Sequence, residues 1–366
     1  MFIKIKAFIQ SLSMKQMVFS LITILSFVIF FILTAWSNSK VNHLIDQQAA
    51  ARWDEEGQSA QVSCFFAEHV EVDDYMIRSF EQQLEKSLLE VLPDREQGEE
   101  NGKRLFIDAY SSQGTIKVTS EKGQLEAQAV GVGGDFFLFH PIQLISGGYF
   151  SGNDLMKDSI VLDEDAAWQL FGSNDIAGMS VMIGDIPHYV VGVIKRQEGR
   201  FAESAGLDKT ILYVSNETLT NYGVSEGIST YEVVAPNPVK KFVYNCVKEK
   251  LGVSENDMVM IENSSRYLPE ALITVILDYG TRTMQSRAIK FPYWENIGRG
   301  WEDVKALVLV FQFIFLLIPV TIIVVFLYIK WRNRTWTWRD VCNYIIDRKD
   351  KFLLRAKEEK DKWQDF

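Results

Sequence analysis

The chain has 366 residues, of which 47% are hydrophobic, and a formal net charge of −10. This acidic balance argues against nucleic acid as a partner, because proteins that bind nucleic acid present basic surfaces. Only three cysteines occur and none belongs to a Cys-x-x-Cys pair, so the sequence offers no thiolate zinc site.

Two apolar runs predict transmembrane helices. Residues 17–36 and residues 306–329 contain no charged side chain, and each is long enough to cross a hydrocarbon core of roughly 30 Å. The first run could instead be a cleaved signal peptide. It is longer than the usual apolar region of such a peptide, and no Ala-x-Ala-like site follows it. Trp36 suits an interfacial anchor, so we predict an uncleaved span.

The distribution of charge predicts how the chain crosses the membrane. Residues 1–16 carry +3 and residues 330–366 carry +4, which leaves −17 for the part between them. Basic segments next to a span stay in the cytoplasm. We therefore expect both termini inside, a basic amphipathic cytoplasmic tail over residues 330–366, and an acidic domain over residues 37–305 outside.

The outer segment begins and ends with the same order of elements. A continuation of the first helix is expected over residues 37–53, from the helical spacing of its apolar residues. Two β-α-β units follow, within residues 60–114 and residues 216–263, and they indicate one compact α+β subdomain. Their expected elements are a strand at 61–67, a helix from Asp73 or Asp74 to about Leu92, strands at 105–110 and 229–235, a helix at 238–251 and a strand at 259–261.

Residues 115–215 lie between these halves and predict an inserted, β-rich subdomain. Glycine pairs and Gly-Asn or Gly-Asp steps punctuate its apolar runs. Residues 264–305 then form a stalk and juxtamembrane segment, whose aromatic and basic residues are typical of a membrane edge. The expected strands are 115–119, 125–132, 159–162, 180–183, 188–194 and 210–215.

Three consecutive acids, Asp163, Glu164 and Asp165, follow the strand at 159–162. As a cluster they could hold a metal or take part in catalysis. Their position at the start of a short helix that ends at Gly172 favours another role. Asp163 suits the N-cap, where its carboxylate accepts first-turn N–H groups, and the next two acids complement the helix dipole.

Other polar candidates also have a structural interpretation. The run from Glu68 to Asp74 could bind a divalent ion, but a solvated loop leading into a helix cap explains it better. A disulfide between Cys64 and Cys246 is possible but unforced. In the second apolar run, Pro319 predicts a kink and Gln312 could hydrogen-bond across helices. We predict no catalytic, cofactor-binding or metal-binding residue.

No P-loop motif occurs, because Gly131-Val-Gly-Gly134 lacks the lysine that such a loop requires. The sequence therefore predicts that the chain does not hydrolyse ATP by itself. Sequence signatures of serine hydrolases and zinc proteases are likewise missing, and the four histidines are scattered along the chain.

One ordered set of short motifs resembles a known family. Leu144-Ile-Ser-Gly-Gly-Tyr-Phe150 precedes the strand and the helix ending Phe171-Gly172, and Ile176-Ala-Gly178 and Tyr189-Val-Val-Gly-Val-Ile194 follow. This order resembles the extracytoplasmic core domain of MacB-type ABC transporter permeases. The resemblance implies a porter-like β-α-β subdomain with an inserted β-rich one, in a protein of the bacterial cytoplasmic membrane. It also implies a cytoplasmic ABC ATPase as a partner.

The family plan has one span before the outer domain and three after it, whereas one span follows here. We therefore expect a subunit truncated to two spans, with a further permease subunit, an oligomeric assembly and contact with membrane lipid. The function expected is coupling of a separate ATPase to the outer domain for export or mechanotransmission. Trp336, Trp338 and Arg339 could contact that ATPase or only anchor at the lipid interface. The alternative function is an extracytoplasmic receptor or envelope scaffold without transport.

Overall fold

The chain forms two compact units in the computed structural model, and each is described by itself. One comprises Met1–Ala35 with Val310–Phe366, and the other comprises Trp36–Leu309. The residues that the structure describes are 13–54, 56–92, 104–282, 289–334 and 342–349.

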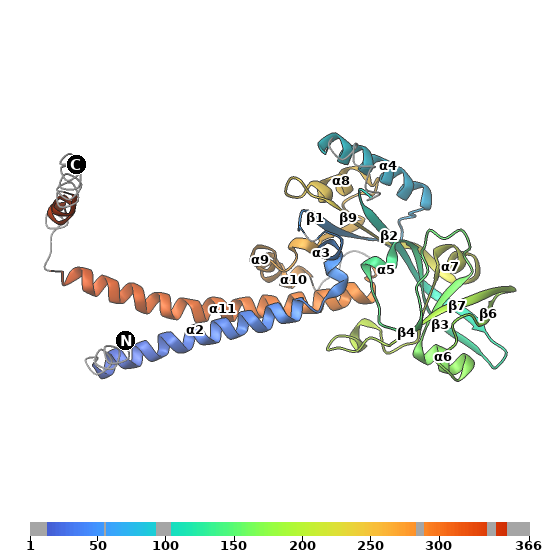
Figure 1. The fold of residues 1–366 in the computed structure, drawn as a ribbon, viewed down its shortest axis with the longest axis horizontal. Helices are drawn as coiled ribbons and strands as arrows, with labels where there is room; N and C mark the ends of the chain where they lie inside the picture. Colours follow the sequence, from blue (N-terminus) through green and yellow to red (C-terminus); the bar gives the residue numbers. More distant parts are fainter. Residues whose placement is uncertain (1–12, 55, 93–103, 283–288, 335–341, 350–366) are drawn as a thin grey trace, which may run out of the picture. The chain divides into compact units, whose positions relative to one another are not determined.

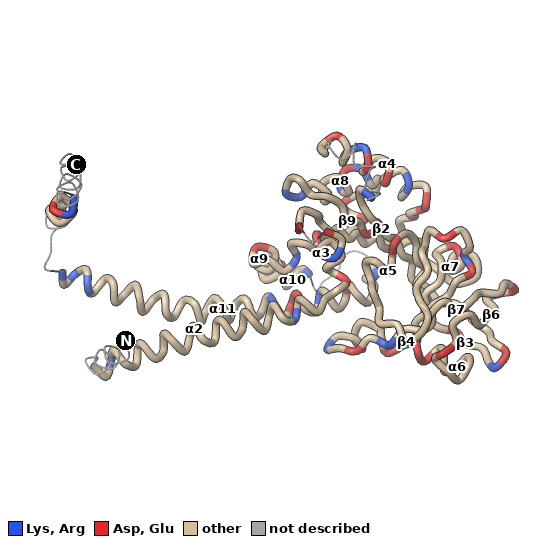
Figure 2. Tube along the Cα trace, viewed as in Figure 1, with Lys and Arg blue, Asp and Glu red and all other residues tan. Residues whose placement is uncertain are grey.

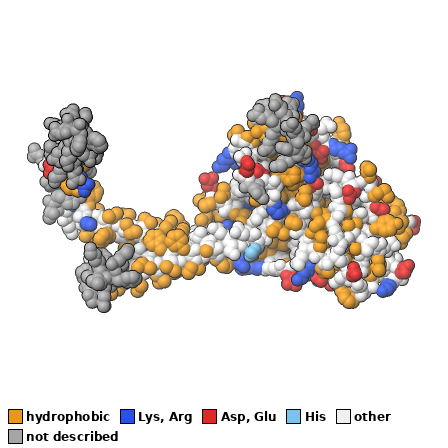
Figure 3. Space-filling view, in the orientation of Figure 1, with side chains coloured by type: hydrophobic (Ala, Val, Ile, Leu, Met, Phe, Trp, Pro, Cys, Tyr) orange, Lys and Arg blue, Asp and Glu red, His pale blue; other side chains and the backbone are white. Residues whose placement is uncertain are grey.

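Two long helices, α2 (Met14–Val41) and α11 (Tyr293–Arg332), contain the two predicted spans. Both are long and apolar enough to cross a membrane, judged by length and composition alone. Figure 2 shows long uncharged stretches in both helices, and Figure 3 shows hydrophobic side chains covering them. Gln312 Nε2 donates a hydrogen bond of 2.9 Å to Thr34 Oγ1, which confirms the predicted contact between the two runs. Helix α11 continues through Pro319.

The prediction of a continuous helix over residues 37–53 is wrong. Helix α2 ends at Val41, and a 3₁₀ turn, η1 (Ile45–Gln48), and a short helix, α3 (Ala49–Trp53), follow it. The Gln48 side chain donates a 2.7 Å hydrogen bond to the Val41 carbonyl, which the end of the helix leaves without an intrahelical partner. Leu44 is buried where the chain turns. The chain therefore packs against the domain at this point and does not continue as a helix.

The two predicted β-α-β units are confirmed, and together they form one four-stranded part of the sheet (Figure 1). Strand β1 lies between β10 and β9 and is antiparallel to both, and β9 also pairs with β2. Helices α4 and α8 pack against each other and bury their apolar faces on this part of the sheet. The elements are β1 (Ser59–Phe66), α4 (Asp74–Val91), β2 (Ile107–Thr119), β9 (Val224–Pro236), α8 (Phe242–Lys250) and β10 (Met258–Glu262).

The remaining strands continue the same sheet beyond β2. Its path is β10-β1-β9-β2-β3-β8-β5-β7-β4, and β6 pairs with both β2 and β7. A second apolar core lies in this part, where helix α6 covers buried strand residues. The elements are β3 (Gln124–Gly134), α5 (Phe136–Phe139), β4 (Leu144–Gly147), β5 (Ser159–Asp163), α6 (Glu164–Phe171), β6 (Ser180–Ile183), β7 (Ile186–Ile194), η3 (Glu203–Ala205), β8 (Ile211–Ser215) and α7 (Asn216–Tyr222).

Strand β2 covers two segments that the sequence predicts as separate strands, 105–110 and 115–119. Gly114 lies between the two segments, and the structure uses it for the close approach of two strands. A Cβ atom on Gly114 would lie 2.2 Å from the Val224 carbonyl oxygen on β9, and the β2–β9 register shifts just before it. The expected boundary between residues 114 and 115 therefore falls inside one strand.

The stalk segment contains three short elements that the sequence did not predict, and they lead to α11. They are η4 (Asn263–Ser265), α9 (Pro269–Leu277) and α10 (Tyr279–Arg282). The tail is helical over residues 342–349.

Candidate functional site: a buried polar network

A carboxylate occupies the interior of the sheet. Glu232 lies on β9, between strands β1 and β2, and is 3% exposed. Ser63 on β1 donates a 2.5 Å hydrogen bond to Glu232 Oε1. The imidazole Nε2 of His140 lies 2.5 Å from Glu232 Oε2. A charge at this depth needs such partners, because an unpaired buried carboxylate is strongly destabilising.

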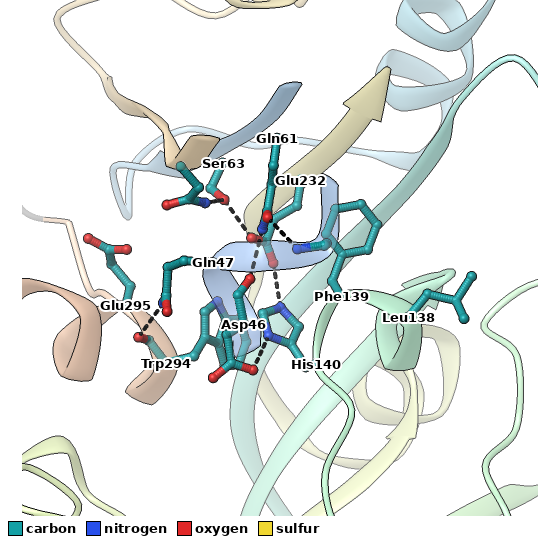
Figure 4. A network of polar contacts seen from close by, with 12 residues as sticks. Asp46, Gln47, Gln61, Ser63, Leu138, Phe139, His140, Glu232, Trp294 and Glu295 are labelled. Carbon is teal, nitrogen blue, oxygen red and sulfur yellow. Dashed lines mark hydrogen bonds and ion pairs between the residues drawn. The ribbon is translucent and has the colours of Figure 1, made fainter. Parts of the chain in front are cut away.

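His140 joins this carboxylate to a second one (Figure 4). It follows helix α5 and is fully buried, and its Nδ1 lies 3.0 Å from Asp46 Oδ1. Burial disfavours the charged imidazole, but Glu232 and Asp46 outweigh it and raise the pKa of His140 to about 9. At neutral pH the three groups therefore form an anion–cation–anion chain. The Trp294 ring covers the imidazole at a centroid distance of 4.2 Å.

The network continues from the sheet to helix α11. Asn263 Nδ2 donates to Ser63 Oγ at 2.7 Å, and Arg266 donates to Asn263 Oδ1 at 3.2 Å. Arg266 binds Glu295 through two hydrogen bonds of 2.7 and 2.8 Å and Glu302 through a third of 2.6 Å. Burial lowers the pKa of Arg266, yet the two carboxylates raise it well above its ordinary value. All three charged groups are buried, so the pairs are screened little by solvent.

Two glutamines fix the segment after α2 in the same region (Figure 4). Gln61 on β1 accepts from the Ala49 N–H and donates to the Asp46 carbonyl, both at 2.8 Å. Gln47 Nε2 donates to the Trp294 carbonyl at 3.1 Å. The segment that leaves α2 is thus hydrogen-bonded both to the sheet and to the start of α11.

We refer to this assembly as the junction network. Its one hydroxyl beside a carboxylate, that of Ser63, is 1% exposed and lies beyond the reach of a substrate. Its chemistry is that of a mechanical link, in which charged groups hold distant segments together. It connects the turn after α2, the centre of the sheet and the first turns of α11. Its members are Asp46, Ser63, His140, Glu232, Asn263, Arg266, Glu295 and Glu302.

Sequence reasoning missed the junction network. The only available signals were isolated polar residues in apolar surroundings, such as Glu232 within a strand of hydrophobic residues. His140 was counted only among scattered histidines. These residues form a site only because the fold brings them together, and no local spacing in the sequence predicts that they meet.

The predicted cap at Asp163 is confirmed. Its Oδ1 accepts from the Ala166 N–H at 2.7 Å, and Oδ2 accepts from the Ile211 N–H of β8 at 3.0 Å. Asp165 pairs with Arg196, and the Arg196 N–H donates to Glu164 at 3.1 Å. Each of the three acids thus has a structural partner, and Asp163 joins the helix to a neighbouring strand as well.

Substitution Asp163→Ala is expected to lower the free energy of unfolding by about 2 kcal/mol. The lost cap contributes about 1 kcal/mol and the orphaned Ile211 N–H a similar amount. Urea unfolding of the full-length protein in mild detergent, followed by tryptophan fluorescence, measures the change. Asp165→Ala is the matched control, because its carboxylate is 45% exposed and the pair with Arg196 contributes little. Equal losses in both variants would contradict the role given to Asp163.

The other predicted candidates are not members of the junction network. Asp73 caps α4 by accepting from the Met76 N–H at 2.8 Å, which confirms the interpretation of the acidic run as a loop and cap. Within the described ranges, no three His, Cys, Asp or Glu side chains are grouped to hold a metal ion. Cys64 and Cys246 are both buried free thiols, so the possible disulfide is not formed.

The glycine run at 131–134 lies in strand β3, not in a loop before a helix. A Cβ atom at Gly133 would lie 2.1 Å from the Tyr110 ring, so packing explains this glycine. In the tail, Trp336, Trp338 and Arg339 lie outside the described residues.

The chain is similar to known transport proteins. Residues 21–241 match the family described as MacB-like periplasmic core domain. Over 79 residues the chain is 32% identical to the macrolide export ATP-binding/permease protein MacB of Chromobacterium violaceum, covering 21% of this chain and 12% of that protein. Over 96 residues it is 32% identical to the protein of the same name from Neisseria gonorrhoeae, covering 26% and 15%. The matched parts thus span less than a fifth of these relatives.

The solved structures that match the chain include the periplasmic region of MacB from Actinobacillus actinomycetemcomitans. It has a TM-score of 0.39 and 16% identity, with 62% of this chain and 96% of that chain covered. The extracellular domain of the noncanonic ABC-type transporter YknZ from Gram-positive bacteria has a TM-score of 0.34 and 15% identity, with 55% and 99% covered.

Proposed function

We propose that this chain, which belongs to the family with a MacB-like periplasmic core domain, is a membrane subunit of an ABC-type export or mechanotransmission complex. A separate cytoplasmic ATPase supplies the energy, and the chain itself hydrolyses no ATP. The proposal is supported by the family match and by two helices apolar enough to cross a membrane. The names of the relatives combine an ATP-binding part with a permease part.

The observation that carries the proposal is the junction network. Asp46 lies five residues after the end of α2, and Glu295 and Glu302 lie in the first turns of α11. Both positions are tied to the sheet through His140 and Arg266. Breaking one buried ion pair costs about 3–5 kcal/mol. A displacement of the start of α11, or of the turn after α2, should therefore move the whole domain before any of these ion pairs breaks.

The arrangement in the membrane is part of the same proposal. Both termini face the cytoplasm of a bacterial cell and residues 37–305 face outward, as the charges of +3, −17 and +4 favour. Two helices cannot enclose a polar path, so a transport path requires further spans beside these two. Residues 330–366 and 1–16 are then the parts that a cytoplasmic ATPase can touch.

Deletion of residues 330–366 tests the proposal. We expect full-length protein to co-purify with a P-loop ATPase in mild detergent, and the deleted form to lose most of it at matched amounts of inserted protein. Coupling requires contact with the motor that differs between its states, and the tail is the longer inner segment. Retention of the ATPase by the deleted form would reject the tail as the contact.

The side of the membrane on which the tail lies is tested separately, as a control for this experiment. Cys342 in the tail should resist a membrane-impermeant thiol reagent in intact cells and react after the cells are opened. Labelling of Cys342 in intact cells would contradict the arrangement. If full-length protein brings down no ATPase, the receptor or scaffold function replaces the transport function.

A further inference from the structure

An open cleft of about 940 Å³ lies in the unit formed by Trp36–Leu309, beside the junction network. One wall is the end of α2 and the turn after it, and another is the loop at residues 195–202 between β7 and η3. The third wall is the first part of α11, at Ile297 and Trp301. Ligand sites in proteins have volumes of roughly 300–1,000 Å³, so the cleft has room for a lipid headgroup and the first carbons below it.

The cleft is basic although the chain is acidic. Lys40, Lys195 and Arg200 line it, and none of the three forms an ion pair with any residue that the structure describes. Arg196 also lines it and pairs with Asp165, while its Nε atom is buried with no hydrogen-bond partner among the described residues. An unpaired donor and three unpaired cations at one place favour an anionic ligand.

The acidic side chains of the cleft do not cancel this charge. The Asp46 carboxylate is engaged by His140 at 3.0 Å. Glu198 is exposed at the rim of the cleft, on the loop at residues 195–202. The cleft thus has four basic side chains against two acidic ones, and one of the two acids is already bound within the protein.

Aromatic rings form the apolar part of the cleft. Phe201 and Trp301 meet edge to face at 5.6 Å, and Trp36 lies 6.4 Å from Trp301. In the sequence, Trp36 closes the first apolar run and Trp301 precedes the second by five residues. Tryptophan at these positions is typical of the level of the lipid headgroups. The cleft therefore combines basic and aromatic surfaces.

We propose that this cleft binds an anionic phospholipid of the outer leaflet. Lys40, Lys195 and Arg200 contact the phosphate, and the aromatic rings contact the glycerol and the upper acyl chains. A soluble phosphate shares the charged part of this chemistry but has nothing to place on the aromatic surface. The inference rests on the outward orientation proposed above and does not depend on an ATPase partner.

The test is lipid retention by the purified full-length protein in mild detergent, measured by native mass spectrometry during titration with phosphatidylglycerol. We expect the double variant Lys195→Gln/Arg200→Gln to bind phosphatidylglycerol on the order of tenfold more weakly, because two phosphate-facing charges are lost. Both side chains are exposed, so the fold should persist. The protein should also prefer phosphatidylglycerol to zwitterionic phosphatidylcholine, and the double variant should lose this preference.

Lys86→Gln/Lys117→Gln is the matched control, because it removes the same charge at exposed lysines that do not line the cleft. It should bind phosphatidylglycerol like the unchanged protein. An equal loss in the control would show unspecific attraction and overturn the site. Competition by inorganic phosphate or glycerol phosphate as effective as that by the lipid would overturn the lipid as its occupant. These outcomes concern lipid binding alone and are the same whether or not an ATPase co-purifies, so they are independent of the test of transport.

Discussion

Replacement of Arg266 by methionine is expected to lower the free energy of unfolding by about 3–5 kcal/mol. Arg266 is buried and binds Glu295 and Glu302 through three hydrogen bonds. Methionine fills similar space but leaves Glu295 buried without its cation and Glu302 with only Arg282. Urea unfolding of the full-length protein in mild detergent, followed by tryptophan fluorescence, measures the loss.

Two further variants separate this effect from a simple change of side chain. Arg104→Met removes an arginine whose pair with Asp135 is 52% exposed on the arginine side, and it should cost under about 1 kcal/mol. The double variant Arg266→Met/Glu295→Met removes both charges of the main pair and should recover part of the loss. The junction network would be the wrong explanation if Arg266→Met cost no more than Arg104→Met.

Local patterns in the sequence predict much of the fold. The helix α4 follows from apolar residues at helical spacing after a capping acid. The cap at Asp163 follows from a strand, an acid at its end and a glycine nine residues after the acid. Each of these signals lies within a few turns of chain. The same reasoning fails at the boundary predicted between residues 114 and 115, since local patterns do not show that β9 approaches the chain at Gly114.

The candidate site could not be predicted in this way. His140 and Glu232 are 92 residues apart, and Arg266 is 29 residues from Glu295. The spacing of single polar residues along the chain does not indicate which of them come into contact. Burial makes each pair important for stability, and this burial arises only when the sheet forms. Gln312 was easier to predict, because a polar side chain within an apolar run has few partners other than another helix.

The second large effect is a loss of stability at alkaline pH that depends on His140. The ordinary pKa of histidine is about 6.5, and the flanking carboxylates raise that of His140 to about 9. The folded protein therefore holds a proton that the unfolded chain releases between these values. The resulting stabilisation is complete below about pH 6.5 and is lost as the pH rises through about 9. It amounts to about 3 kcal/mol.

The measurement is the free energy of unfolding between pH 6 and pH 10 for the unchanged protein and for His140→Gln. Their difference should shrink by about 3 kcal/mol over this range, since glutamine carries no charge to lose. His188→Gln is the control at another buried histidine, because burial lowers the pKa of His188, away from the alkaline range in which His140 titrates. The control should keep the alkaline loss of the unchanged protein, and a constant difference for His140→Gln would contradict a charged imidazole.

This pH dependence also tests whether the attachments of α2 and α11 to the sheet are independent of each other. Above about pH 9 the imidazole between Asp46 and Glu232 is neutral, so the turn after α2 is held to the sheet by hydrogen bonds without the central cation. The Arg266 pairs keep their charge in the same range, because the pKa of Arg266 lies far above it. Alkaline pH should therefore loosen the attachment of α2 while that of α11 persists. Protease cleavage near residues 42–45 should then increase before cleavage near η4, and simultaneous cleavage at both places would show that the two attachments are not independent.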